Sequence, residues 1–350
     1  MDQDTKNFIK GLAKAVIQVG KKVTPAVATA VIYKNIFGHR IETNKYLTFL
    51  MSDFKGLSRV RCSFKTNNKN TLVGYTYIYK DLKPKALIVF AHGFGGGGQT
   101  SYLDIIDHLA SQGYVVFAYD ATANDESTGE TLRGFPQAVI DLEQAIKFAR
   151  GLREFSKLPL VLFGHSMGAY SVSNVLNFYP NVKCVVAASG FNKSSEIVKQ
   201  HANEFDEGQA DEIIPYIDTY EEIEFGKYAK KSAVEGFKNT KANILIIHSE
   251  DDEVIPISSG LDLYKNELRN CSRMNYIRLK NSGHGEVFYT AEGKQYCKLL
   301  NTTYKKLAKQ KETTPELLEQ FKNSIDRDRY SRMVDVKLFE KITKFIDSSI

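Results

Sequence analysis

The chain has 350 residues, of which 43% are hydrophobic and 25% are charged, and its formal net charge at pH 7 is +6. This composition excludes a disordered or collagen-like chain, and the length allows one large α/β domain with insertions or two modest domains. There is no arginine-rich tract and no basic patch interleaved with aromatic residues, so we do not expect the protein to bind nucleic acid.

Cysteine usage and the N-terminal residues bear on the compartment. The four cysteines have no C-x-x-C pair and no regular spacing, which favours a reducing compartment (Cys62, Cys184, Cys271 and Cys297). Lysines interrupt the first 14 residues before a signal-peptide core could form. The longest nearly apolar run near the N-terminus, residues 26–33, is too short to span a bilayer. We therefore expect a cytoplasmic protein.

Residues 1–56 predict a helical N-terminal extension. Apolar residues of the stretch 7–20 recur on one helical face, with lysines nearly opposite, and a second helical stretch, 27–37, follows Pro25. A basic amphipathic helix of this kind packs on the main domain or makes a weak contact with a membrane surface or partner. Packing is favoured, because the apolar face is small and lacks tryptophan.

The next elements predict an α/β fold. Residues 57–64 and 71–79 form an antiparallel hairpin, because the second stretch alternates between two faces. From residue 85 onward, short continuous apolar strands alternate with helices, which indicates a mostly parallel sheet covered on both faces. The expected strands are 86–91, 114–119, 160–163, 182–188, 244–248 and 275–279, and the expected helices are 101–111, 135–150, 167–178 and 258–269.

About fifty residues between the strands near Ser189 and Ala242 are too many for a simple connection, for which ~2 to 6 residues are usual. Residues 192–240 therefore predict a helical cap or lid insertion between two parts of the core, 57–191 and 241–350. Between positions 193 and 224 this insertion has ten acidic residues and two lysines. At the C-terminus, the spacing of Leu338, Ile342, Phe345 and Ile346 predicts a closing helix, and the charge-rich stretch 305–332 predicts a solvated surface.

The most informative motif is G-x-S-x-G at Gly164, Ser166 and Gly168. An apolar strand precedes it and a helical stretch follows, which is the context that a nucleophile elbow requires. The serine must stand on a tight turn, and the two glycines leave room for it. The sequence thus predicts Ser166 as a nucleophile.

Three other segments follow predicted strands, where ligands and catalytic groups of an open parallel sheet collect. The segment 91–98 is rich in glycine, and the N–H of Phe94, with that of Met167, can face a developing oxyanion. The glycine-rich segment lacks the features of a Walker motif or a dinucleotide fingerprint.

The segment 248–256 holds several carboxylates, one of which can orient a histidine. His284 lies between two glycines after the last strand. The order Ser, Asp, His is that of the α/β-hydrolases.

Residues 84–290 resemble the α/β-hydrolase superfamily, in particular the monoacylglycerol lipase and serine aminopeptidase type, through H-G-x-G, G-H-S-M-G, a late G-x-x-D-x-x-V-P-like segment that ends at Pro256, and a final G-H. The resemblance implies an α/β-hydrolase fold with Ser166 as nucleophile, His284 as base, Asp252 as acid and the amides of Phe94 and Met167 as oxyanion hole. Asp251 is the alternative acid, and His92 and His165 are structural. The loop 119–129 departs from the family pattern, because Ala123 and Asp125 replace two glycines.

Together these features predict a serine hydrolase, most simply a carboxylesterase, that acts on a small-molecule acyl substrate without a cofactor or metal. His284 would take the proton of Ser166, and water would cleave the resulting acyl-enzyme. A peptidase or amidase and an acyltransferase on the same triad are alternatives, as is a non-catalytic binding protein on a hydrolase scaffold. The oligomeric state is left open.

Overall fold

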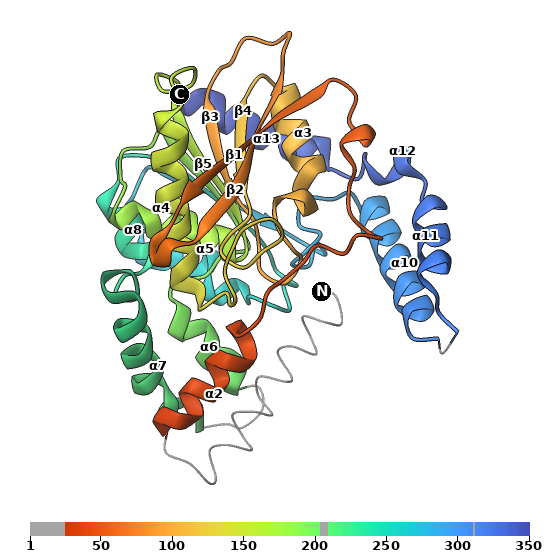
Figure 1. Ribbon diagram of the computed structural model, residues 1–350. Coiled ribbons are helices and arrows are strands. Elements are labelled where there is room, and N and C mark those ends of the chain that lie inside the picture. Colours follow the sequence, from red (N-terminus) through yellow and green to blue (C-terminus); the bar gives the residue numbers. More distant parts are fainter. Residues whose placement is uncertain (1–24, 204–208, 311) are drawn as a thin grey trace.

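The computed structural model describes residues 25–203, 209–310 and 312–350 (Figure 1). Within these ranges the chain forms an eight-stranded sheet of order β1-β2-β4-β3-β5-β6-β7-β8. The strands are β1 (Leu57–Lys65), β2 (Thr71–Tyr79), β3 (Leu87–Ala91), β4 (Val115–Tyr119), β5 (Leu160–His165), β6 (Cys184–Ala188), β7 (Asn243–Ser249) and β8 (Met274–Leu279). β2 is antiparallel to β1 and β4, and the other pairs are parallel. The predicted fold class is confirmed.

Alternating side chains of each central strand bury opposite faces of the sheet. In β3, Leu87 and Val89 lie in one apolar layer, and Ile88 and Phe90 lie in the other. The first layer is shared with α4 (Phe135–Gly151), α5 (Met167–Asn174), α8 (Ala233–Asn239) and α9 (Leu261–Glu267), and the second with α3 (Leu103–Ser111) and α13 (Val336–Ser349). Full burial stabilises each such side chain by about 1.5–3 kcal/mol. Because both faces are covered, the strand sequences are continuously apolar.

Between β6 and β7 the chain forms α6 (Ser194–Asn203) and α7 (Gln209–Phe225) before α8. α8 packs on α5 and contributes Phe237 to the main core. α7 contacts α6 and also α2 (Pro25–Phe37), which precedes the sheet in sequence, so that α2, α6 and α7 form one group of helices (Figure 1). The predicted helix at 7–20 lies outside the described residues.

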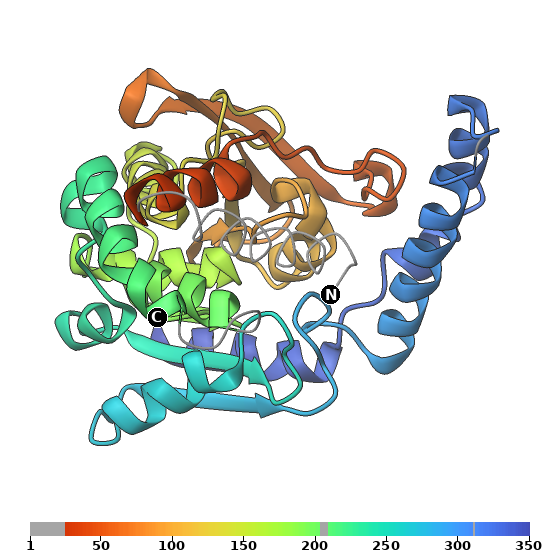
Figure 2. The same ribbon diagram turned by 90° about the horizontal axis from the view of Figure 1, so that it is seen from below.

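The prediction of a solvated surface for residues 305–332 is wrong in part. This stretch includes the end of α10 (Ala291–Ala308), α11 (Pro315–Asn323) and α12 (Arg327–Tyr330), which lie beside the sheet as a helical arm (Figure 2). Phe321, Ile325 and Tyr330 are buried. The ring of Tyr330 stacks on Phe49 with centroids 4.5 Å apart. The segment before β1 therefore covers apolar positions that the high charge of the arm obscures in the sequence.

The predicted closing helix is confirmed as α13, in which Leu338, Ile342 and Ile346 are buried and Phe345 packs at the edge of the same layer. None of the helices in the described ranges has both the length and the apolar character needed to cross a bilayer.

Candidate active site

Ser166 stands on the turn between β5 and α5, with φ 56° and ψ −119°. Such a conformation costs of order 1–3 kcal/mol for a residue with a side chain and persists only when its surroundings enforce it. Around this turn, α5 packs closely against β5 and β3, and this packing requires the two glycines of the motif. A Cβ on Gly164 would lie 2.3 Å from the Gly168 oxygen, and a Cβ on Gly168 would lie 2.0 Å from the Ala91 oxygen. The strand, turn and helix thus lie as the motif predicts.

The structure brings Ser166, His284 and Asp252 together at the carboxyl ends of β5, β8 and β7. His284 Nε2 lies 2.8 Å from Ser166 Oγ, and His284 Nδ1 lies 2.8 Å from Asp252 Oδ2. All three residues are less than a tenth exposed. Because a carboxylate only accepts hydrogen bonds, the proton of the neutral imidazole lies on Nδ1, and Nε2 accepts from the serine hydroxyl. This is the geometry of a nucleophile with its base and an orienting acid.

The Asp252 carboxylate is held in its ionised form. Oδ1 accepts hydrogen bonds from the N–H groups of Val254 (3.0 Å) and Ile255 (2.8 Å). Burial alone would raise the pKa of Asp252, but the charges and hydrogen bonds of His284 and His248 outweigh burial and hold that pKa well below its usual range. The ionised carboxylate therefore serves as the acceptor for His284 Nδ1.

His248, which the sequence analysis did not select, is a second histidine beside this carboxylate. Its Nε2 lies 2.8 Å from the Ile255 oxygen and 3.3 Å from Asp252 Oδ2, and the residue is fully buried. A carbonyl oxygen only accepts, so Nε2 carries the proton. Its position at the end of β7, four residues before Asp252, is the only signal in the sequence that could have indicated this contact.

Asp251, the alternative acid, binds elsewhere. Its Oδ1 accepts hydrogen bonds from the hydroxyl of Ser249 and from the N–H groups of Ser282 (3.0 Å) and Gly283 (3.2 Å). Asp251 therefore fixes the loop that precedes His284, whereas Asp252 binds the imidazole itself.

The two candidate oxyanion residues lie in the segments that follow β3 and β5. Met167 is the first residue of α5, where backbone N–H groups have no partner within the helix. Phe94 follows β3 in a loop that runs beside the elbow, because a Cβ on Gly93 would lie 3.4 Å from Ser166 Cβ. Phe94 and Met167 both line a cavity of about 10 Å³, room for about one water molecule. The structure thus brings both predicted residues to the same side of the site.

A chain of hydrogen bonds connects this loop to His284, the predicted base. The Gly93 N–H donates to the Tyr102 hydroxyl (3.0 Å), which lies 2.9 Å from His165 Nδ1, and His165 Nε2 lies 2.9 Å from the His284 carbonyl oxygen. Burial, then the charge of His284, lowers the pKa of His165 to about 3, so the ring is neutral. Its single proton lies on Nε2, facing the carbonyl, and Tyr102 therefore donates to Nδ1. Tyr102 was not selected from the sequence.

His92 is the other histidine with an expected structural role. Among the described residues, its ring forms hydrogen bonds with backbone groups only. Its Nδ1 lies 2.7 Å from the Gly93 oxygen, and its Nε2 accepts from the Ala121 N–H at 2.9 Å. Burial lowers its pKa below the ordinary value. His92 thus joins the ends of β3 and β4 as a neutral side chain.

The loop after β4 keeps a glycine-like backbone without the glycines. Ala123 has φ 60° and Asp125 has φ 37°, both in the region that disfavours side chains. These are the two positions at which the sequence departs from the family pattern. Contacts with the segment before β1 hold both residues in place: the Ala123 carbonyl accepts from Ile41 N–H (2.9 Å), and the Asp125 N–H donates to the Ile41 carbonyl (3.1 Å).

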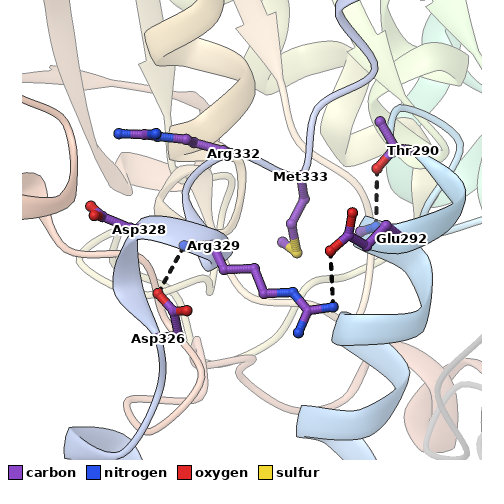
Figure 3. Close-up of a pocket in the computed structure, with 8 residues that line it drawn as sticks. Thr290, Glu292, Asp326, Asp328, Arg329, Arg332 and Met333 are labelled. Atoms are coloured by element: carbon purple, nitrogen blue, oxygen red, sulfur yellow. Dashed lines mark hydrogen bonds and ion pairs between the residues drawn. The ribbon is translucent and has the colours of Figure 1, made fainter.

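A separate cavity of about 280 Å³ lies where α10 meets α12, and its lining includes none of Ser166, Asp252 and His284 (Figure 3). Figure 3 shows Arg329 extending toward Glu292, and their Nη2 and Oε1 atoms are 3.2 Å apart. Both side chains are largely exposed. Across the described part of the chain, no group of three His, Cys, Asp or Glu side chains is arranged to hold a metal ion.

Comparison with known proteins shows what part of the chain is similar to a known family. Residues 82–217 match the model of the serine aminopeptidase S33 family. A monoglyceride lipase homolog of monkeypox virus is 32% identical over 88 residues, which cover 25% of this chain and 31% of that protein.

Two solved structures share the fold. An esterase of Pyrococcus furiosus has a TM-score of 0.54 at 14% identity, and the match covers 76% of this chain and 98% of that one. The acylaminoacyl peptidase of Pyrococcus horikoshii has a TM-score of 0.52 at 16% identity, covering 85% of this chain and 42% of that one. With the sheet order and the elbow described above, these likenesses show that the chain has the α/β-hydrolase fold, and residues 82–217 are similar to the serine aminopeptidase S33 family.

Proposed function

We propose that the protein is a serine hydrolase that cleaves carboxylic esters through an acyl-enzyme on Ser166. The observation that carries this proposal is the pair of 2.8 Å contacts from His284, one to the Ser166 hydroxyl and one to Asp252. A serine hydroxyl is a weak nucleophile unless a positioned base removes its proton as it attacks. His284 is in place to do this.

In the first half-reaction, Ser166 Oγ attacks the ester carbonyl while His284 Nε2 takes its proton. The N–H groups of Phe94 and Met167 stabilise the negative charge on the tetrahedral oxygen. His284 then gives the proton to the departing alcohol oxygen, and the C–O bond to the alcohol breaks. Water repeats the sequence on the acyl-enzyme and releases the acid. In comparable enzymes the loss of one oxyanion donor lowers turnover by about 10²–10³-fold.

The virus protein named as a monoglyceride lipase homolog supports an ester substrate. We therefore take small-molecule carboxylic esters, including monoacylglycerols, as the substrate class. The triad itself does not separate an ester from an amide.

Labelling with a fluorophosphonate probe tests the proposal. Ser166→Ala is expected to lose labelling and ester hydrolysis, whereas Ser173→Ala, which removes a buried hydroxyl of the helix that follows Ser166, is expected to keep both. A panel of nitrophenyl esters from acetate to laurate, a monoacylglycerol and matched anilides then defines the acyl length and separates esterase from amidase. Labelling or turnover that persists in Ser166→Ala would place the nucleophile elsewhere.

A further inference from the structure

The segment that follows α2 crosses two loops of the candidate site. We call residues 37–43 the strap. Ile41 forms a parallel bridge with Asn124, in the loop after β4. The Arg40 guanidinium donates to three carbonyl oxygens of the same loop, those of Asp125 (2.7 Å), Ser127 (2.9 Å) and Gly129 (2.8 Å). The strap therefore forms hydrogen bonds with backbone groups of this loop that would otherwise bind water.

Thr43, at the end of the strap, joins this loop to the loop after β3. Its N–H and its hydroxyl each donate to the Asp125 carboxylate at 2.6 Å. The Gly98 N–H in turn donates to Thr43 Oγ1 (3.1 Å) and to Asp125 Oδ2 (3.0 Å). A Cβ on Gly97 would lie 2.0 Å from Thr43 Oγ1, so the threonine fits only because that residue has no side chain. One amide of the glycine-rich loop is thus held by the strap.

The other end of the strap contacts the same glycine-rich loop at Phe94. The ring of Phe37 packs edge-on against the ring of Phe94, with centroids 5.8 Å apart, and against Phe135 at 5.0 Å. Phe37 is 1% exposed. The loop from Phe94 to Gly98 is therefore fixed at both ends by residues 37 and 43.

These contacts matter because the loop carries a proposed oxyanion donor. A run of four glycines has little conformational preference of its own. An oxyanion donor is effective only when it is held in place before the reaction, within about 0.5 Å of the productive geometry. We propose that Thr43 is a positioning residue, which through Gly98 and Asp125 holds the loop so that the Phe94 amide faces the oxyanion. The strap lies before residue 82, where the family match begins, and the inference rests on the proposed function.

Thr43→Val removes the hydroxyl and keeps the shape of the side chain, and Thr43→Ser keeps the hydroxyl. The matched control is Thr240→Val, because Thr240 Oγ1 also donates (to the Pro180 oxygen, 2.6 Å) and accepts (from the Ala242 N–H, 3.1 Å). Thr240 lies before β7, at the amino end of the sheet, and Ser166 lies at the carboxyl end. Turnover of an ester and inhibition by a trifluoromethyl ketone, which forms a tetrahedral adduct with serine, are measured for each variant.

Thr43→Val is expected to lower kcat by about 10- to 30-fold with KM within about twofold, less than the loss of an entire donor. The inhibition constant of the ketone should rise in parallel, because its adduct uses the same oxyanion hole. Thr43→Ser should recover kcat to within about threefold of wild type, and Thr240→Val should keep wild-type kcat. If Thr43→Val does not fold, Asp125→Asn is used instead, because it weakens the same hydrogen bonds between residue 43, residue 125 and Gly98. The same fall in kcat and the same rise in the inhibition constant are expected for it.

Wild-type kcat and ketone affinity in Thr43→Val would overturn the inference, as would equal losses in Thr43→Val and Thr240→Val. The proposed function is judged separately by Ser166→Ala. Loss of labelling in that variant, together with an unaffected Thr43→Val, rejects the strap and leaves the hydrolase in place. Labelling that persists in Ser166→Ala rejects the nucleophile, and the strap inference falls with it.

Discussion

The hydroxyl of Tyr102 donates a hydrogen bond to His165 Nδ1 across 2.9 Å. The same hydroxyl accepts from the Gly93 N–H, and the opposite nitrogen of His165 donates to the His284 carbonyl. The loop that carries one proposed oxyanion donor is therefore connected to the loop that carries the proposed base. Each group in this chain has the donor or acceptor that its neighbour needs.

Tyr102→Phe should lower kcat by about tenfold. The variant leaves the Gly93 N–H without its acceptor and His165 without its donor, and an unsatisfied buried polar group costs about 1–3 kcal/mol. The control is Tyr114→Phe, whose hydroxyl donates to Asp347 at 2.7 Å beside α13. Steady-state kinetics and melting temperatures of both variants check the prediction. Equal effects on kcat would show that Tyr102 contributes only to stability.

Asp252→Asn should reduce kcat by roughly 10³–10⁴-fold, as the equivalent change does in other triad enzymes, because an amide no longer fixes the tautomer of His284. Asp251→Asn should cost only a few-fold, since its remaining oxygen still accepts from the Ser282 and Gly283 amides. Measuring kcat for both variants separates the two adjacent carboxylates. A larger loss in Asp251→Asn would reverse their assignment.

Two neighbouring glycines of the loop after β3 should respond differently to alanine. Gly97 has φ 94°, and a Cβ there would lie 2.0 Å from Thr43 Oγ1, so Gly97→Ala must displace the loop or the strap. Apart from its own chain neighbours, no heavy atom of the residues that the structure describes lies within 4 Å of a Cβ built on Gly96. We expect kcat to fall at least tenfold in Gly97→Ala and to stay within about twofold in Gly96→Ala, since misplaced catalytic groups lose activity steeply. Comparable activity in both would show that the loop tolerates movement.

Glu221 should make stability depend on pH. Its carboxyl group in α7 is 1% exposed and accepts hydrogen bonds from the hydroxyls of Tyr33 in α2 and Ser194 in α6. Burial, despite these two hydrogen bonds, raises the pKa of Glu221 from its ordinary 4.5 to about 7. The folded protein therefore binds this proton more tightly than the unfolded chain does. The resulting stability is fully present below pH 4.5 and is lost as the pH rises through about 7.

Glu221→Gln stays neutral and keeps an acceptor oxygen, so it should be more stable than wild type at pH 8 and similar at pH 4.5. The difference should reach at most about 3 kcal/mol, at 1.36 kcal/mol for each unit of pKa. Denaturant unfolding at both pH values measures it. Glu222→Gln, at an exposed position paired with Lys230, is the control and should show no such trend. Parallel curves for wild type and Glu221→Gln would contradict the raised pKa.

The sequence by itself determined the sheet, the elbow at Ser166 and the chain order of Ser166, Asp252 and His284. These features are local: apolar runs, a glycine-flanked serine and strand ends depend on residues close together in the chain. The fold class and most strand bounds follow from them within one or two residues.

Only the tertiary structure decided which of two adjacent carboxylates meets His284, because Asp251 and Asp252 have the same chemistry and differ only in the direction that the turn after β7 gives them. Thr43 and Tyr102 also carry no periodic signal, since their partners lie on other strands and loops, and His248 meets Asp252 only because the turn after β7 folds back on the strand. The burial of Tyr330 depends in the same way on Phe49, far away in the sequence. Local propensity sets the elements, but a hydrogen bond or a stacked ring between distant segments exists only after the chain has folded.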